Sequence, residues 1–538
     1  MGPNREPRRG IRRGAALTGF EPEPLMTPQF QEVFLSEDRV QSIAIVGGGA
    51  AAWLAAATLA RRLRADFCDI RVIDMAPESG AAISEAALPS FHRLNNLLGI
   101  DENDLLRKTR GTFRLGAQFA DWGRVGDRYF HTYGSFGAKL DAVPFHHYWI
   151  KLRQAGEAAG IEEFSTAALA ARAQRFAHAS LDPRSMASLY SYGYHFHAQL
   201  LAAYLREYAE AHGVTRVARN VVDIPLGSAD GFIDALHLDD GSRLVADLYI
   251  DCGAVPGAWF GRPRPQAFED WSQWLPCDRA VGALCESRAD PAPYAESTAQ
   301  SAGWRMRTPL QGCLDTSYVY SSRHISDDEA AATLRRELPG TALTEPRVRR
   351  LLPGRPIRFW DKNWLALSGG ALDTLESTGL HLVQTGITRL LTLFPVRRHS
   401  PPDIEEYNRL TINEHERIRD FLILHFKATQ RSDAPFWDHC RRLAIPDTLQ
   451  AKIELFRRCG RIAMLDDEHF GEDSWIALFL GQNLEPLDYD PLADVLDEGE
   501  VKSALSRMRA MIAAGVEALP THANYIERHC SAGFGAGW

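Results

Sequence analysis

The sequence predicts an α/β protein in which a Rossmann-like nucleotide-binding module precedes a largely helical C-terminal region. Three observations support this fold class. A β-rich run, a glycine cluster and a helix-forming run follow one another within residues 42–64. Later apolar runs at residues 243–251 and 364–367 also lead into glycine-containing segments. In the C-terminal third, apolar residues recur at helical spacing, as in residues 404–429 and 500–519.

The composition is that of a globular protein and excludes several classes. Of the 538 residues, 45% are hydrophobic and 24% are charged, which argues against a disordered chain. The net charge of −9 argues against nucleic acid or an anionic membrane as the main partner, because phosphate binding needs a cationic face. The eight cysteines form no C-x-x-C pair, so the sequence indicates no metal site and suits a reducing cytoplasm. The uncharged residues 43–60 are too rich in Gly and Ala to indicate a membrane span.

The chain divides into three predicted parts. Residues 1–38 alternate Arg, Pro, Gly and Glu without periodicity and are expected to form a disordered N-terminal extension. Residues 39–400 are expected to hold the nucleotide-binding module, with inserted segments that contact the substrate. Residues 401–538 are expected to form a mainly helical substrate region. The sequence leaves the oligomeric state open, with a homodimer among the options.

A dinucleotide fingerprint is the clearest motif. The segment from Gly47 to Ala52 follows a predicted strand and opens a predicted helix, as the G-x-G-x-x-G/A motif requires. The pyrophosphate is expected at the free N–H groups of the helix N-terminus. An acidic residue ends the second predicted strand, 25 residues after Gly49, where it is expected to bind a ribose hydroxyl. The predicted cofactor-binding residues are Gly47, Gly49, Ala50, Ala51, Ala52 and Asp74.

Two alternatives accompany this motif. A glycine-rich corner without any ligand has the same local sequence, and the fingerprint alone does not separate FAD from NAD. Its place near the start of the chain, together with Asp251, Cys252 and Gly253 after a later strand, favours FAD and a flavoprotein. A second G-x-G-x-x-G for a nicotinamide cofactor is not evident, so an NAD(P)H-dependent hydroxylase is a weaker hypothesis.

Several longer segments, in the same order along the chain, resemble the flavin-dependent halogenases of the tryptophan halogenase family. The resemblance runs from about residue 43 to the C-terminus. It includes the glycine box and the tryptophan at position 53 that follows it. The other matching segments are residues 84–89, 98–102, 130–134, 246–252, 372–379 and 419–425, with Phe436 and Trp437 after them.

The resemblance implies the fold of a flavin monooxygenase-type FAD module and a two-component reaction. A separate flavin reductase supplies reduced FAD, which with oxygen and chloride or bromide yields hypohalous acid. A Lys presents the electrophilic halogen to an aromatic substrate of indole or phenol type, and a Glu stabilises the cationic intermediate and removes its proton. The flavin performs the oxidation, whereas the protein orients the reagents.

The resemblance also assigns roles to individual residues. Glu376 occupies the position of the catalytic Glu, and a carboxylate there is suited to accept the ring proton; a Glu satisfied by a helix dipole is the alternative. Ser377, Thr378 and Gly379 match the residues that line the halide and flavin site, although an ordinary helix cap has the same sequence. The predicted substrate contacts are His131, Tyr133 and Phe470, for which core packing is the alternative.

Three segments depart from the family pattern. Arg114 stands where the family has its catalytic Lys, and a guanidinium stays protonated at any working pH, so it is a poor nucleophile. In the stretch that matches the W-x-W-x-I-P signature, Met306 and Thr308 replace the second Trp and the Ile. Ser84 precedes Glu85 where the family has Gly before Glu. The segments expected to bind the flavin therefore resemble the family more closely than the segments expected to contact the substrate.

These departures leave three hypotheses. The chain is a halogenase in which Arg114 guides the halogen oxidant, a flavin monooxygenase that oxygenates its substrate directly, or a FAD-binding homologue that has lost turnover. The halogenase is preferred on motif matching.

Overall fold

The computed structural model describes residues 39–75, 82–141, 143–180, 182, 185–253, 258–259, 262–263, 268–367, 372–395 and 400–533. The predicted N-terminal extension at residues 1–38 lies outside the described residues.

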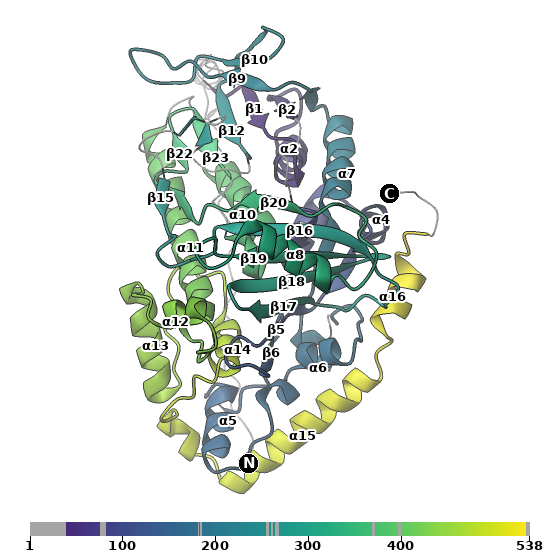
Figure 1. The fold of residues 1–538 in the computed structure, drawn as a ribbon, viewed down its shortest axis with the longest axis vertical. Coiled ribbons are helices and arrows are strands. Elements are labelled where there is room, and N and C mark those ends of the chain that lie inside the picture. Colours follow the sequence, from purple (N-terminus) through teal and green to yellow (C-terminus); the bar gives the residue numbers. More distant parts are fainter. Residues whose placement is uncertain are drawn as a thin grey trace, which may run out of the picture. The chain divides into compact units, whose positions relative to one another are not determined.

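A six-stranded sheet contains the first strands of the chain (Figure 1). Its strand order is β22-β23-β12-β1-β2-β8, and every neighbouring pair is parallel except β22 with β23. Parallel order with the first strand central is the pattern of a nucleotide-binding α/β module. Its strands are β1 (Ser42–Val46), β2 (Asp69–Ile73), β8 (Thr215–Val217), β12 (Leu248–Asp251), β22 (Trp360–Asp361) and β23 (Trp364–Ala366).

Helix α2 (Ala50–Leu63) crosses from β1 to β2 and confirms the predicted strand–glycine–helix–strand unit. The helix is nearly all Ala and Leu on its buried side, so its backbone lies close to the sheet and to α7 (Ala198–Ala211). Arg61 and Arg62 in its last turn suit the negative end of the helix dipole. The main hydrophobic core lies around this unit.

The expected single strand at residues 243–251 is wrong, because the chain forms β11 (Arg243–Leu244) and, separately, β12. Asp247 explains the break. Its carboxylate accepts hydrogen bonds from the backbone amides of Gln41 and Ser42, and its own amide donates to the carbonyl oxygen of Ser42. These contacts hold the residues between β11 and β12 against the start of β1, so the ladder of β11 does not continue.

A seven-stranded sheet forms the second layer, drawn mainly in teal in Figure 1. Its order is β20-β16-β19-β18-β17-β5-β6, antiparallel except for β17 beside β5. A second core, rich in Trp and Phe, connects this sheet to the helices after residue 400. Its strands are β5 (Gly116–Ala120), β6 (Arg128–Thr132), β16 (Arg279–Glu286), β17 (Ala295–Gln300), β18 (Gly303–Leu310), β19 (Cys313–Tyr320) and β20 (Arg347–Arg350).

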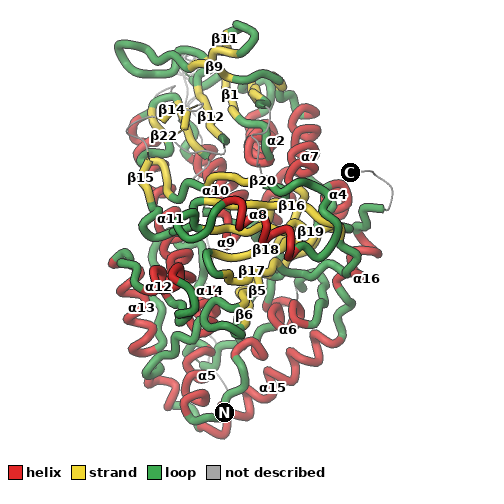
Figure 2. Tube along the Cα trace, viewed as in Figure 1, coloured by secondary structure: helices red, strands yellow, loops and turns green. Residues whose placement is uncertain are grey.

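Helices predominate after residue 400 (Figure 2). Helix α11 (Pro401–Lys427) begins at a proline, whose fixed φ suits a first helical turn. Helix α15 (Glu498–Glu517) is capped by Asp497, which accepts from the amides of Gly499 and Glu500. The others are α12 (Pro435–Arg441), α13 (Asp447–Cys459), α14 (Glu472–Gly481), the 3₁₀ turn η3 (Pro491–Asp494) and α16 (His522–His529).

The remaining elements complete the two layers. A three-stranded sheet has the order β3-β7-β4 and brings β3 over the seven-stranded sheet. Its strands are β3 (Ser84–Ala87), β4 (Thr112–Arg114) and β7 (Gly193–His197). The other strands are β9 (Val221–Asp223), β10 (Leu236–Leu238), β13 (Ala258–Trp259), β14 (Arg262–Pro263), β15 (Phe268–Asp270) and β21 (Gly354–Pro356). The other helices are α3 (Phe91–Leu98), α4 (Glu102–Lys108), α5 (Phe145–Gln154), η1 (Ile161–Phe164), α6 (Thr166–Arg172), η2 (Met186–Leu189), α8 (Asp327–Glu337), α9 (Asp373–Glu376) and α10 (Gly379–Thr392).

Candidate active site

The glycine turn between β1 and α2 has the geometry of a dinucleotide cradle. Gly47 has φ +138°, and a Cβ there would lie 3.2 Å from the carbonyl oxygen of Cys252, so a side chain is strained at this position. A Cβ at Gly49, by contrast, would meet nothing within 4 Å, and within the described residues no side chain caps α2. The backbone at the helix start is therefore open to an incoming pyrophosphate, which fits FAD.

The other predicted cofactor residues surround this turn. Ala50 and Ala52 are buried and Ala51 is half-buried at the start of α2. Asp74 follows β2, and its Oδ1 atom would lie 2.6 Å from a Cβ at Gly48, so the structure brings this carboxylate to the glycine turn as expected. Its Oδ2 atom accepts a hydrogen bond of 2.6 Å from Nε of Arg216. Sequence reasoning missed Arg216, because only the pairing of β8 with β2 places it there.

Residues 376–379 form a sharp connection between α9 and α10. Ser377 has φ +57°, the left-handed region that non-glycine residues seldom occupy. The Thr378 hydroxyl donates to the carbonyl oxygen of Leu372 and does not cap α10. The N–H groups at the start of this 14-residue helix therefore have no side-chain cap among the described residues. Backbone strain of this kind is common at functional sites.

Glu376 is buried, with 2% of its surface exposed, and lies between two imidazoles. Nδ1 of His131 on β6 lies 3.0 Å from both carboxylate oxygens. Nε2 of His425 on α11 lies 3.0 Å from Oε1. The hydroxyl of Tyr129 lies 3.3 Å from Nδ1 of His425. In the tautomer in which that nitrogen accepts from Tyr129, Nε2 carries the proton; it lies close to Glu376 without the alignment of a hydrogen bond.

The two imidazoles keep Glu376 ionised. Burial raises the pKa of the carboxyl, but attraction and hydrogen bonding from His131 and His425 outweigh it, so the net pKa lies below its usual range. Burial lowers the pKa of His425, although Glu376 opposes this. The carboxylate is thus a charged, water-excluded base held by two neighbours.

Aromatic side chains enclose the same region. Phe470 is buried and stacks on Phe421 of α11, with ring centroids 3.8 Å apart and an interplanar angle of 16°. The His131 ring lies 5.4 Å from Phe421 and 5.8 Å from Phe470. The predicted contact residues His131 and Phe470 are thus neighbours, and His131 is also the partner of Glu376. Sequence reasoning placed His425 in a matching segment but gave it no role.

Arg114 is fully buried at the end of β4. Its Nε donates to the carbonyl oxygen of Gly116 at 3.2 Å, and its guanidinium lies 5.5 Å from the ring centroid of Tyr133. Among the described residues, Nη1 has no hydrogen-bond partner and no carboxylate forms an ion pair with this side chain. A buried cation without a counter-charge is costly, so it indicates a place for an anion or a polar ligand.

Tyr133 connects Arg114 electrostatically with Glu376. Burial raises the pKa of its phenol to about 12, with Arg114 lowering and Glu376 raising it. Its hydroxyl has no hydrogen-bond partner within the described part of the chain. The three predicted residues therefore belong to one buried region, assembled from the end of β4, the residue after β6 and the end of α9.

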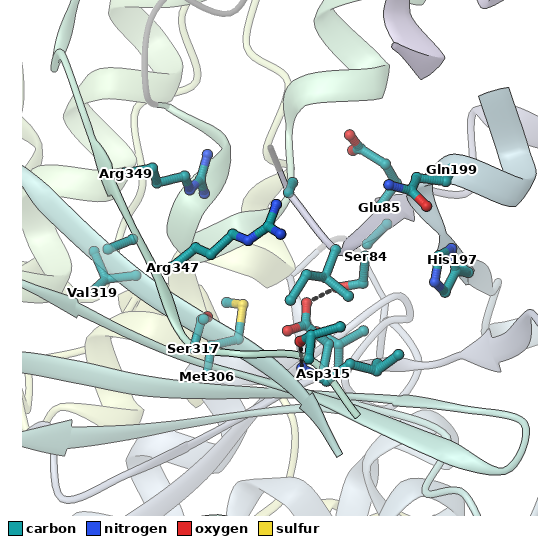
Figure 3. A pocket seen from close by; sticks show the side chains of 18 of the residues that line it. Ser84, Glu85, His197, Gln199, Met306, Asp315, Ser317, Val319, Arg347 and Arg349 are labelled. Atoms are coloured by element: carbon teal, nitrogen blue, oxygen red, sulfur yellow. Dashed lines mark hydrogen bonds between the residues drawn. The ribbon is translucent and has the colours of Figure 1, made fainter. Parts of the chain in front are cut away.

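A cavity of about 320 Å³ lies on the other side of residues 376–379, between β3 and one face of the seven-stranded sheet (Figure 3). Every second residue of β16, β18, β19 and β20 lines it, as the pleat of a sheet requires. Small residues at the centre of the sheet, Ala280, Gly282 and Ser317, make its floor flat. Ser377 and Gly379 line the cavity, whereas Glu376 does not.

Apart from Arg114, the positions at which the sequence departs from the family pattern line the cavity. Met306 lies opposite Ser317, and Thr308 lies opposite Asp315, in the pairing of β18 with β19. Ser84 and Glu85 line it from β3. Trp304 is buried in the second core, with its ring 5.7 Å from that of Trp122. The altered signature therefore forms part of the cavity wall.

A dinucleotide cradle, a flat cavity and a buried carboxylate behind it define an α/β flavoprotein with an oxidoreductase site. The family model described as tryptophan halogenase matches residues 42–498. The chain belongs to the tryptophan halogenase family.

Individual relatives agree with this assignment. The tryptophan 7-halogenase KtzQ of Kutzneria sp. (strain 744) is 29% identical over 81% of this chain and 86% of its own. The solved structure of Xcc4156, a flavin-dependent halogenase from Xanthomonas campestris, matches with a TM-score of 0.88 and 37% identity, over 93% of this chain and 100% of that chain. BrvH, a flavin-dependent halogenase from Brevundimonas sp. BAL3, matches with a TM-score of 0.86 and 39% identity, over 91% and 99%.

The family defines the class of reaction. Its members are halogenating oxidoreductases that use FAD, reduced by a separate flavin reductase, and halide, and they act on aromatic substrates. The comparisons favour a halogenase over a monooxygenase that oxygenates directly or a homologue without turnover. None of the helices in the described residues combines the length and apolar character that a bilayer crossing requires.

Proposed function

We propose that this halogenase separates oxidant formation from aromatic substitution across residues 376–379. The observation that carries the proposal is the opposite orientation of neighbouring residues. Ser377 and Gly379 line the cavity on the sheet, whereas the Glu376 carboxylate contacts His131 and His425 on the other side. A single short connection thus provides residues to two sites.

FAD fits the first side. The glycine turn would hold its pyrophosphate through Gly47, Gly49, Ala50, Ala51 and Ala52, with Asp74 near the ribose. The flat floor on the sheet suits the isoalloxazine ring. Bound reduced FAD supplies, with oxygen and halide, the hypohalous acid. The uncapped N–H groups of α10, with Ser377, Thr378 and Gly379, suit a halide ion.

Arg114 and Glu376 act on the second side. The free Nη1 donor of Arg114 is suited to hold the oxygen of hypohalous acid, because a guanidinium keeps its protons. The halogen transfers to a ring carbon and leaves hydroxide, which becomes water when Glu376 passes to it the proton taken from the ring. Glu376 stabilises the resulting ring cation and takes its proton. A carboxylate of low pKa suffices as the base, because such a ring cation is strongly acidic.

We propose an indole- or phenol-type ring as the substrate, held by His131, Tyr133 and Phe470. The buried rings of His131 and Phe470 beside Glu376 support this choice. A cytoplasmic location, supported by eight free thiols, and a homodimer are finer predictions of the same proposal. Sedimentation analysis of the purified chain checks the dimer.

The test uses the purified chain with FAD, a flavin reductase, NADH and bromide, and a panel of indoles and phenols. We expect a mass gain of one bromine minus one hydrogen on at least one substrate, dependent on bromide and the reductase. Oxygenated product without halogen would contradict the proposal. Anomalous density from bromide beside residues 377–379 in a soaked crystal locates the halide, and its absence there would contradict that part.

A further inference from the structure

Asp315 lines the cavity and has a buried carboxylate oxygen without a hydrogen-bond partner among the described residues. It lies on β19 and lines the cavity together with Ser317 and Val319 of the same strand. Only 9% of its surface is exposed. Its Oδ2 atom accepts a hydrogen bond of 2.5 Å from the hydroxyl of Ser84 on β3 (Figure 3). No donor of the described residues forms a hydrogen bond with Oδ1. A buried acceptor of this kind is satisfied in native proteins by a ligand or a water.

The surroundings of Asp315 show what kind of group is missing. Thr308 on β18 and Leu284 on β16 flank it in the sheet register, and Ser84 covers it from β3. The charged and titratable residues that line the cavity are Glu85, His197, Glu345, Arg347 and Arg349. Figure 3 shows Arg347 and Arg349 extending from one side of the cavity, and Glu85 and His197 on the other. The missing partner is thus a hydrogen-bond donor on a group that lies over the floor of Ala280, Gly282 and Ser317.

We propose that Asp315 is a flavin-contacting residue whose Oδ1 atom accepts a hydrogen bond from the ring N–H of the isoalloxazine. This rests on the proposed function, in which the cavity takes that ring. Oxidised flavin carries a single ring N–H, at N3, on the polar edge of an otherwise flat system. Ser84 positions the carboxyl, because its hydroxyl donates to one carboxylate oxygen and the other oxygen is left to accept from the cofactor.

The protonation state of the Asp315 carboxyl then affects the affinity for flavin. Burial raises the pKa of Asp315 to about 6, against the opposing effects of Ser84 and Arg349. The ionised form is the better acceptor for an N–H donor, so bound flavin favours loss of the proton. Linkage then requires flavin to dissociate more readily as the pH falls through this pKa, by up to about tenfold per pH unit.

The experiment measures the Kd of oxidised FAD by quenching of its fluorescence between pH 5 and pH 8, with the full-length chain. We expect the wild-type Kd to rise steeply below about pH 6. In Asp315→Asn this pH dependence should be lost, since no proton is exchanged at this position. Thr316→Val is the matched control. Thr316 is also buried on the same strand but does not line the cavity, so this variant should keep the wild-type profile.

A second probe tests the hydrogen bond itself. N3-methyl FAD lacks the donor, and wild type should bind it at least about tenfold more weakly than FAD. Asp315→Ala should bind the two flavins equally. Wild-type discrimination that persists in Asp315→Ala, or an unchanged pH profile in Asp315→Asn, would overturn this proposal while leaving the halogenase intact. A wild-type chain that binds no FAD at any pH overturns the flavin site as a whole.

Discussion

Nδ1 of His131 lies 3.0 Å from each oxygen of the buried Glu376 carboxylate. This contact joins α9 to β6, two elements separated by more than two hundred residues. It fixes the direction of the carboxylate and, with His425, holds it in the ionised state. Because the Glu376 carboxylate is already ionised, it can accept a proton directly.

Glu376→Gln removes the base and keeps the shape of the side chain. We expect halogenation to fall by about 10²–10⁴-fold, because a positioned general base contributes a factor of that size. FAD binding and oxygen consumption should remain, since the residue does not line the cavity. Product formation and oxygen uptake, measured together, check this. Equal loss of both would contradict the separation of the two sites.

Replacement of His425 distinguishes a positioning role from a structural one. His425→Asn replaces the ring whose Nε2 atom contacts Glu376 by a shorter side chain. The carboxylate should then be less well positioned, and the pKa of the carboxyl should rise. We expect the acid limb of the kcat profile to move to higher pH, while the KM of the aromatic substrate changes little. Rates between pH 4 and pH 8 check this, and an unshifted acid limb would contradict it.

Arg114→Lys tests the altered catalytic position. Lys also keeps a positive charge but loses the planar fork and the free Nη1 donor, so the rate of halogenation should change without loss of FAD affinity. Arg114→Met should abolish halogenation yet leave stability equal or higher, because it removes a buried cation that has no carboxylate partner among the described residues. Halogenation in the Lys variant alone, with none in wild type, would refute the native enzyme as a halogenase.

The two outer glycines of the fingerprint should respond differently to alanine. Gly47→Ala places a Cβ 3.2 Å from the carbonyl oxygen of Cys252 at φ +138°, so we expect about 1–3 kcal/mol of destabilisation. Gly49→Ala meets nothing within 4 Å and should leave the Tm unchanged while weakening FAD binding. Thermal melts and FAD titrations of both variants check this. Unaltered FAD affinity in Gly49→Ala would contradict the pyrophosphate position.

The stability of the flavin-free chain should depend on pH through Asp315. Its pKa is raised from 3.8 to about 6 by burial, so the folded state binds this proton more tightly than the unfolded state. The ionised carboxyl therefore destabilises the fold as the pH rises from about 4 to about 6, by at most about 3 kcal/mol. Asp315→Asn lacks this penalty. Its Tm relative to wild type should be higher at pH 7.5 than at pH 4.5, and an equal difference at both would contradict the burial.

Local signals were sufficient for much of the fold. β1, α2 and β2 lie where the glycine cluster and the flanking β-rich runs predict them, because those conformations depend on neighbouring residues. The helices α11 and α15 likewise follow from apolar spacing and caps. The break between β11 and β12 was not predictable, since Asp247 makes its deciding contacts with residues some two hundred positions away.

The sequence by itself determined the nucleotide-binding unit and the family, and it named the candidate residues of the site. Only the tertiary structure decided that His131 and His425 lie against Glu376, that Arg114 is buried without a counter-ion among the described residues, and that one carboxylate oxygen of Asp315, a residue of the cavity lining, has no hydrogen-bond partner among them. Such relations depend on strand register and on which faces of distant elements meet. A sequence read along the chain contains neither, because hydrogen bonds and burial are properties of groups brought together in space.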